Sequence, residues 1–136
     1  MSILRTYVVP RPFNGYNIPI SIQSSYLKDY AKKNNLIFSL PVTEITSSNS
    51  YSILCGILQN NKELTDLAFT SIFVLPIADI DKVNQIFNKK VPTNIKLHFV
   101  LENKVLSIND MLEFIKDIGP LKKLVLNYKS FLELVS

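Results

Sequence analysis

The sequence has few of the residues from which metal centres and common catalytic sites are built. Its 136 residues include one cysteine, one histidine, no tryptophan and three glycines. The single cysteine, Cys55, excludes a disulfide within the chain, and one histidine with one cysteine cannot form a typical zinc site. The G-x-G-x-x-G and phosphate-loop motifs of nucleotide-binding proteins are missing, as is the G-x-S-x-G motif of serine hydrolases. We therefore expect no metal and no cofactor.

Concentrated charge and long apolar segments are missing as well. The net charge of +4 comes mainly from lysines spread along the chain, which is typical of a solvated surface and disfavours a nucleic-acid-binding patch. The longest apolar stretch, residues 67–78, contains Pro76 and is too short to span a bilayer. The first residues, MSILRTYVV, lack the apolar core of a secretory signal. These features predict a cytoplasmic protein with neither a membrane nor a nucleic acid as its partner.

The hydrophobic pattern predicts a single α/β domain. Hydrophobic residues make up 47% of the chain and charged residues 19%, which is ordinary for a globular protein. The pattern predicts strands at residues 3–9, 36–42, 67–75 and 95–101, and helices at 20–33, 50–60, 80–87 and 107–118. Strands that alternate with helices form parallel crossover units. We predict one three-layer domain over residues 1–136, with a mainly parallel four-stranded sheet and helices on both of its faces.

A further apolar stripe marks residues 120–136. Its members recur at helical spacing and are Leu121, Leu124, Val125, Tyr128, Leu132 and Val135. This pattern predicts a C-terminal amphipathic helix that packs on the body of the domain or on a second subunit. Because the α/β domain is already complete before this segment, the apolar face favours a homo-oligomer.

The segment from Tyr7 to Gln23, YVVPRPFNGYNIPISIQ, holds the most informative polar residues of the chain. It places Arg11 and Asn14 just after the first predicted strand, and α/β folds bind ligands at the carboxyl ends of their strands. A guanidinium presents a planar fork of donors that matches phosphate or carboxylate. The ring of Tyr16, in the same loop, is a candidate for contact with a ligand. Asn14 and Gln23 are suited to hydrogen-bond ligand hydroxyls.

Two acidic residues follow later strands. Glu44 comes after the second predicted strand and Glu102 after the fourth, so both are expected on the same edge of the sheet as Arg11. Two carboxylates can act as acid and base where their environments separate their pKa values. We therefore predict Glu44 and Glu102 as the catalytic residues if the protein is an enzyme; the alternative is that these loop charges are only solvated. His98, the single histidine, lies within a strand and is expected to be structural.

The order of elements resembles the catalytic domain of serine recombinases of the resolvase type. The resemblance includes Ile22-Gln23 at the start of the first helix and Leu75-Pro76 after a later strand. That family carries a Tyr-x-Arg-x-Ser motif, whose serine attacks a DNA phosphate. In this chain Val9 and Arg11 stand at the positions of the motif's arginine and serine. The family also has a pair of arginines after its third strand, and the corresponding residues 77–81 contain none. The resemblance therefore implies a resolvase-like fold, with a flavodoxin-like one as the alternative, and no recombinase activity.

A closer resemblance is to the sporadic carbohydrate cluster family, which is encoded beside bacterial surface-polysaccharide genes. The shared pieces lie between about residues 5 and 118 and are RPFNGYNIP, Ile22-Gln23, Thr43-Glu44, Tyr51, FVLP and LHFVLENKVL. The family pattern usually has serine where Pro10 stands. The resemblance implies a role in the biosynthesis of a surface glycan and adds Tyr51 to the substrate-binding residues, but it implies no particular reaction.

These observations give three functional hypotheses. The first is a cytoplasmic protein of surface-carbohydrate biosynthesis that binds a sugar, sugar phosphate or nucleotide sugar through Arg11, Asn14, Tyr16, Gln23 and Tyr51. The second is a non-catalytic module that assembles with an enzyme of the same pathway. The third is a DNA-binding remnant of the resolvase architecture, which the scattered lysines make the least favoured.

Overall fold

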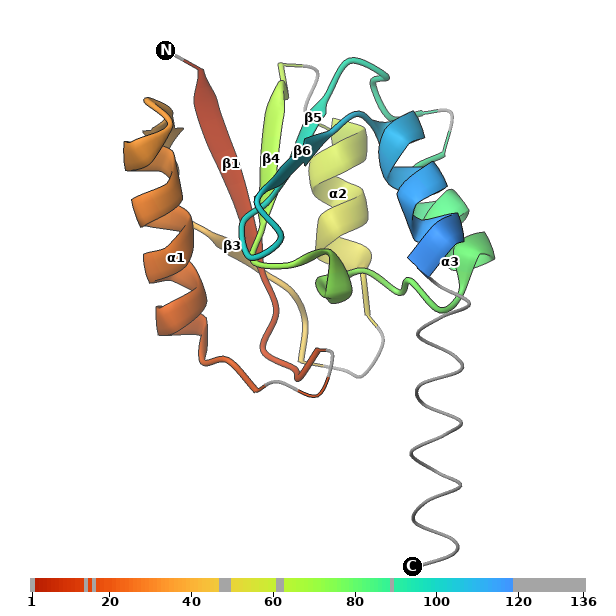
Figure 1. Cartoon of the computed structure of the whole chain (residues 1–136), viewed down its shortest axis with the longest axis horizontal. Helices are drawn as coiled ribbons and strands as arrows, with labels where there is room; N and C mark the ends of the chain where they lie inside the picture. The colour runs from red at the N-terminus through yellow and green to blue at the C-terminus, as the bar shows by residue number, and fades with distance from the viewer. Residues whose placement is uncertain are drawn as a thin grey trace, which may run out of the picture.

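The computed structural model describes residues 2–13, 15, 17–46, 50–60, 63–88 and 90–118. Within them a sheet lies between two helical layers, as Figure 1 shows. The predicted α/β class and three-layer arrangement are therefore confirmed. The predicted C-terminal helix at residues 120–136 and the predicted site residues Asn14 and Tyr16 lie outside the described residues.

The sheet contains six strands among the described residues, where the sequence predicts four. They are β1 (Ile3–Val8), β2 (Ile37–Phe38), β3 (Val42–Thr43), β4 (Asp66–Phe69), β5 (Lys96–Phe99) and β6 (Lys104–Leu106). The strand order is β2-β1-β4-β5-β6, and β3 also pairs with β1. All pairs are parallel except β5 with β6. The sequence thus predicts the parallel part of the sheet but not the short antiparallel edge strand β6.

Strands β2 and β3 replace the single strand predicted at residues 36–42. β2 pairs with the beginning of β1, and β3 pairs with its end. Between them the chain leaves the ladder near Pro41, which has no N–H to donate. The Ser39 hydroxyl keeps this segment against β1 by donating to the Leu4 carbonyl at 3.0 Å. As a result, β3 delivers Glu44 to the carboxyl end of β1.

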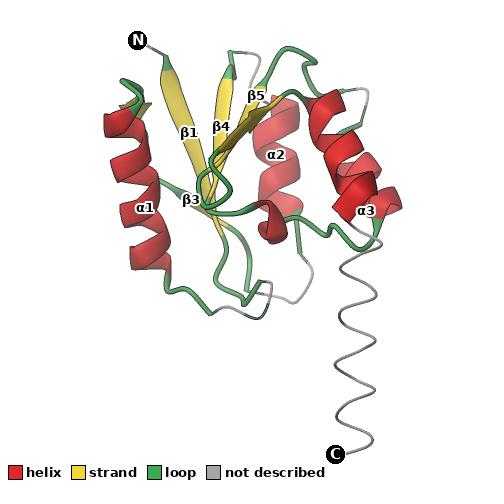
Figure 2. Ribbon diagram, viewed as in Figure 1, coloured by secondary structure: helices red, strands yellow, loops and turns green. Residues whose placement is uncertain are grey.

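One helix covers one face of the sheet, and the other helices cover the opposite face (Figure 2). α1 (Ile20–Lys33) has the bounds that the sequence predicts and buries Leu27 and Ala31 against the sheet. The larger core on the opposite face is enclosed by α2 (Ser52–Asn60), α3 (Ile80–Ile86) and a helix at residues 108–118. None of the helices in the described part of the chain is long and apolar enough to cross a membrane.

The segment predicted as one strand at residues 67–75 divides into two elements. β4 ends at Phe69, and Ile72–Val74 form a short 3₁₀ helix, η1. The hydroxyl of Ser71 caps η1 by accepting the N–H of Phe73 at 3.1 Å. A continuous apolar run does not distinguish a strand from another buried element, which is why the sequence pattern misses this break.

Candidate functional site

The predicted site residues that the structure describes gather around the carboxyl ends of the parallel strands, at the lower edge of the sheet in Figure 1. Arg11 follows β1, Glu44 follows β3, Glu102 follows β5, Gln23 lies in α1, and Tyr51 immediately precedes α2. Among the described residues, no cluster of histidine, cysteine, aspartate and glutamate has the arrangement of a metal site. The contacts of each residue show whether its polar groups are already engaged within the protein.

Glu44 is a buried carboxylate at the start of α2, with only 3% of its surface exposed. One of its oxygens accepts the N–H of Ile53 at 3.2 Å, and the other accepts that of Leu54 at 3.3 Å. The hydroxyls of Tyr7 and Ser50 also donate to it, at 2.7 and 3.3 Å. A carboxylate with these partners satisfies the free N–H groups of a helix start and complements its dipole. The geometry therefore favours a role in fixing α2.

The hydrogen bond between Glu44 and Tyr7 shifts the ionisation of both groups. Burial by itself raises the pKa of Glu44, but the bonds from Tyr7 and from backbone N–H groups outweigh it and leave the pKa below its ordinary value. Burial raises the pKa of Tyr7 well above its ordinary value, and the Glu44 carboxylate raises it further. At neutral pH Glu44 is thus an anion and Tyr7 a neutral donor. With the two pKa values shifted apart in this way, the proton stays on Tyr7, and neither group is suited to exchange a proton with a substrate.

Glu102 has a similar position at the start of η1. One of its oxygens accepts the hydroxyl of Ser71 at 2.8 Å, and the other accepts the N–H of Ile72. The half-buried side chain thereby links the turn after β5 to the segment after β4. Both acidic residues are engaged at helix starts, and their catalytic roles stay predictions.

Gln23 is fully buried and joins three segments at the same edge. Its amide nitrogen donates to the carbonyls of Val9 and Ile18, both at 2.8 Å. Its oxygen accepts the N–H of Val9 and the hydroxyl of Thr70, both at 3.3 Å. These four bonds hold the loop after β1 against the end of β4, and the predicted contact of Gln23 with a ligand stays a prediction.

The guanidinium of Arg11 keeps an unused donor. Nη1 donates to the carbonyl of Ser50 at 2.8 Å, and the guanidinium carbon lies 4.5 Å from the centre of the Tyr51 ring. Nη2 is buried and has no hydrogen-bond partner in the described part of the chain. Leaving a buried donor without an acceptor costs about 1–3 kcal/mol, and more when the group is charged. Because this atom has almost no accessible surface, an acceptor on a ligand would stabilise it only after a neighbouring side chain moves aside.

A second cation approaches the same aromatic ring. Nζ of Lys82, in α3, lies 5.2 Å from the centre of the Tyr51 ring, so positive charges from two distant segments converge on one side chain. Burial raises the pKa of the Tyr51 hydroxyl, while the Arg11 guanidinium opposes this shift. We call Arg11, Tyr51 and Lys82 the cationic cluster. The sequence singles out the first two but not Lys82, because one lysine among many carries no local signal.

A separate hydrogen-bonded chain joins Asp66, His98 and Tyr30 on the face of the sheet that α1 covers. Nε2 of His98 lies 2.7 Å from an Asp66 oxygen, and Nδ1 lies 2.6 Å from the Tyr30 hydroxyl. Because an ionised carboxylate only accepts, Nε2 carries the proton in the neutral imidazole and Nδ1 accepts from Tyr30. His98 is buried with a partner on each nitrogen, which confirms the expectation of a structural histidine.

Comparisons with known proteins bear on the fold. No family model matches the chain, and no curated protein matches it. Among solved structures, the chain is similar to a resolvase family site-specific recombinase from Streptococcus pneumoniae, with 13% identity and a TM-score of 0.55 over 98% of this chain and 97% of that one. The predicted resolvase-like fold is therefore confirmed, whereas the resemblance to the sporadic carbohydrate cluster family has no support from these comparisons.

Proposed function

We propose that this is a cytoplasmic protein of bacterial surface-carbohydrate biosynthesis that binds a sugar phosphate or nucleotide sugar at the cationic cluster. The observation that supports the binding of an anion is the buried Nη2 of Arg11, which has no acceptor among the described residues. The carbohydrate pathway rests on the sequence pieces shared with the sporadic carbohydrate cluster family.

The charge of the cationic cluster selects the chemistry of the ligand. Phosphate oxygens are strong acceptors for a guanidinium donor, and charge-assisted bonds of this kind are about twice as strong as neutral ones. Lys82 adds a second positive charge beside the same ring. Because Glu44 and Glu102 each already accept two or more hydrogen bonds, we propose ligand binding and assign no reaction.

Calorimetry with glucose 1-phosphate, UDP-glucose and uncharged glucose tests this proposal. We expect the two phosphorylated compounds to bind and glucose not to bind. Arg11→Met should weaken binding by about tenfold or more, the equivalent of one charge-assisted hydrogen bond. Lys96→Met is the matched control, because it removes one exposed positive charge at the opposite edge of the sheet. Unchanged affinity in Arg11→Met would remove Arg11 from the site.

A second candidate function is the binding of nucleic acid by a resolvase-like remnant, which the similarity to the recombinase structure favours. The same guanidinium would then contact a DNA phosphate. Duplex DNA added to the same calorimetric series separates the two candidates, because phosphate contacts release counterions and make the affinity fall steeply with salt. Steep salt dependence with no response to the sugar phosphates would favour the nucleic acid.

The third possibility is a non-catalytic module that binds a partner enzyme. We also propose that the chain forms a homo-oligomer. A protein that binds none of these compounds alone, but co-purifies with an enzyme of its pathway, would support the module. Light scattering of the purified chain tests the homo-oligomer directly, and a strict monomer would contradict it.

A further inference from the structure

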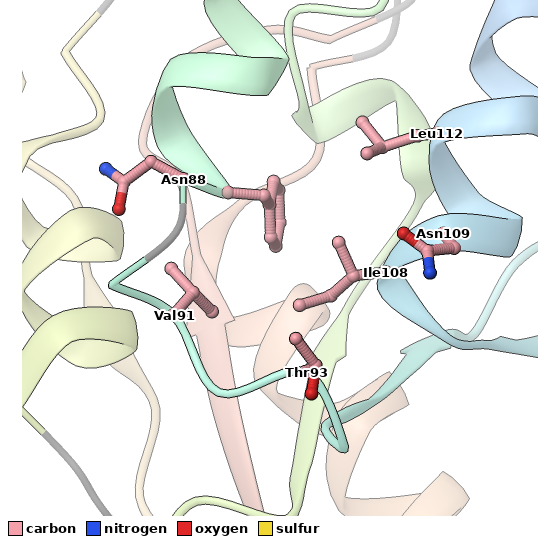
Figure 3. Close-up of a pocket in the computed structure, with 7 residues that line it drawn as sticks. Asn88, Val91, Thr93, Ile108, Asn109 and Leu112 are labelled. Carbon is pink, nitrogen blue, oxygen red and sulfur yellow. The ribbon is translucent and has the colours of Figure 1, made fainter.

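A small pocket lies beside the amino end of β5 and shares no residue with the cationic cluster. Its volume is about 180 Å³, and it opens between the end of α3, the loop before β5 and the start of the helix at residues 108–118. The residues that line it are Phe87, Asn88, Val91, Thr93, Ile108, Asn109 and Leu112. Figure 3 shows side chains from the loop and from the helix facing one another across this space.

The interior of the pocket is apolar. Phe87, Val91 and Ile108 are 7%, 4% and 8% exposed, respectively, so each presents only a small surface, and that surface is turned to the pocket. A cavity of about 150 Å³ with such a lining holds one benzene molecule. The pocket therefore has room for a single six-membered ring, and apolar contact with these side chains would be the main source of affinity.

The polar groups that line the pocket belong to Asn88, Thr93 and Asn109. The amide of Asn88 is already engaged, since it donates to the Gln85 carbonyl and accepts the N–H of Lys90, both at 2.9 Å. Thr93 and Asn109 are exposed, which leaves a hydroxyl and an amide for a ligand. None of the seven lining residues is ionisable, so a charged ligand would lose hydration without gaining a counter-charge.

We infer that this pocket binds a neutral six-membered ring that carries at least one hydroxyl group. The ring body contacts Phe87, Val91 and Ile108, and a hydroxyl at its edge bonds to Thr93 or Asn109. This second site is independent of the function proposed for the cationic cluster, because the two share no residue. A phenolic ring and a pyranose ring share this chemistry, and the experiment separates them.

An NMR titration of the ¹⁵N-labelled full chain tests the inference with four probes: phenol, benzene, methyl glucoside and benzoate. We expect phenol or methyl glucoside to shift the amide signals of Val91, Thr93 and Asn109 in a saturable way, and benzoate to leave them unchanged. A response to phenol alone identifies an aromatic ligand, and a response to the glucoside identifies a sugar. Absence of saturable shifts with both probes would overturn the inference.

Two variants connect the shifts to the pocket. Ile108→Phe fills the interior and should weaken binding by about tenfold or more. Asn109→Ala removes only an exposed amide, so it should fold normally and weaken phenol about threefold to tenfold, the equivalent of one hydrogen bond, without weakening benzene. Asn84→Ala, an exposed change in α3 outside the pocket, should leave both affinities unchanged. Equal weakening of phenol and benzene by Asn109→Ala would contradict the proposed polar contact.

Discussion

Replacing Glu44 by glutamine tests the structural role of the buried carboxylate. The change keeps the size of the side chain but removes its charge and turns one acceptor oxygen into an NH₂ donor. In the native protein both oxygens face donors, from the N–H groups of Ile53 and Leu54 and from the hydroxyl of Tyr7. The glutamine NH₂ group must therefore face at least one of these donors without an acceptor.

The expected loss of stability follows from these contacts. Hydrogen bonds to a charged group contribute about 1.5–3 kcal/mol, and loss of a helix cap costs about 1 kcal/mol. Glutamine keeps one accepting oxygen, so we expect Glu44→Gln to lower the free energy of unfolding by about 3 kcal/mol at neutral pH. For a domain of this size, such a loss lowers the melting temperature by about 10 °C.

The loss should also depend on pH. Since the folded protein lowers the pKa of Glu44, the ionised carboxylate stabilises the fold above its ordinary pKa of about 4.3, and this contribution disappears as the pH falls through the folded value. The difference between the native protein and Glu44→Gln should therefore be largest near neutral pH and shrink as the solution is acidified. Because glutamine does not titrate, the Glu44→Gln protein lacks this pH-dependent contribution to stability.

Urea denaturation followed by circular dichroism, at neutral and acidic pH, measures both effects. Glu63→Gln is the control, because it makes the same chemical change at an exposed position and should alter the free energy of unfolding by less than about 0.5 kcal/mol. If Glu44→Gln behaves like this control at both pH values, the carboxylate does not hold α2 and the reasoning fails.

Three further predictions concern other polar groups. In Glu102→Gln, loss of one of the two oxygens that accept from Ser71 and from the N–H of Ile72 should cost about 1–2 kcal/mol in urea denaturation, and no loss would contradict the cap at η1. His98→Leu removes the imidazole donor of the buried Asp66 carboxylate and leaves it the Thr65 hydroxyl, which should cost about 1.5–3 kcal/mol, whereas adding Asp66→Leu should recover part of this. A double variant less stable than the single one would refute this account. Burial raises the pKa of the Cys55 thiol, so iodoacetamide should modify the native protein more slowly than the urea-unfolded chain, and equal rates would refute the effect.

The local pattern of apolar residues was sufficient to predict α1 but not the elements that depend on long-range contacts. α1 has the predicted bounds because its apolar stripe ends at Asn34-Asn35, where Asn35 has a φ of 55°. β6 has three residues, and it depends on pairing with β5, which no local pattern encodes. The division of residues 67–75 into β4 and η1 likewise depends on Glu102, which comes from a distant turn.

The candidate site was predictable in its position but not in the role of each residue. Parallel topology alone places Arg11, Glu44 and Glu102 at one edge of the sheet. The roles depend on contacts between residues far apart in sequence, such as the bond from Tyr7 to Glu44. A carboxylate after a strand has the same local sequence whether it binds a ligand or caps a helix.

At the carboxyl ends of the parallel strands, the sign of a side chain's charge distinguishes a helix cap from a candidate ligand-binding group. The carboxyl ends of parallel strands lie beside the starts of helices, and helix starts present N–H groups that need acceptors. Glu44 and Glu102 are acceptors, so each finds partners within the protein. Arg11 is itself a hydrogen-bond donor and lies near the N–H groups of a helix start, so one of its nitrogens has no acceptor among the described residues. The cation at this edge, and not the acids, therefore keeps a polar atom without a partner among the described residues, which is why the proposed ligand is an anion.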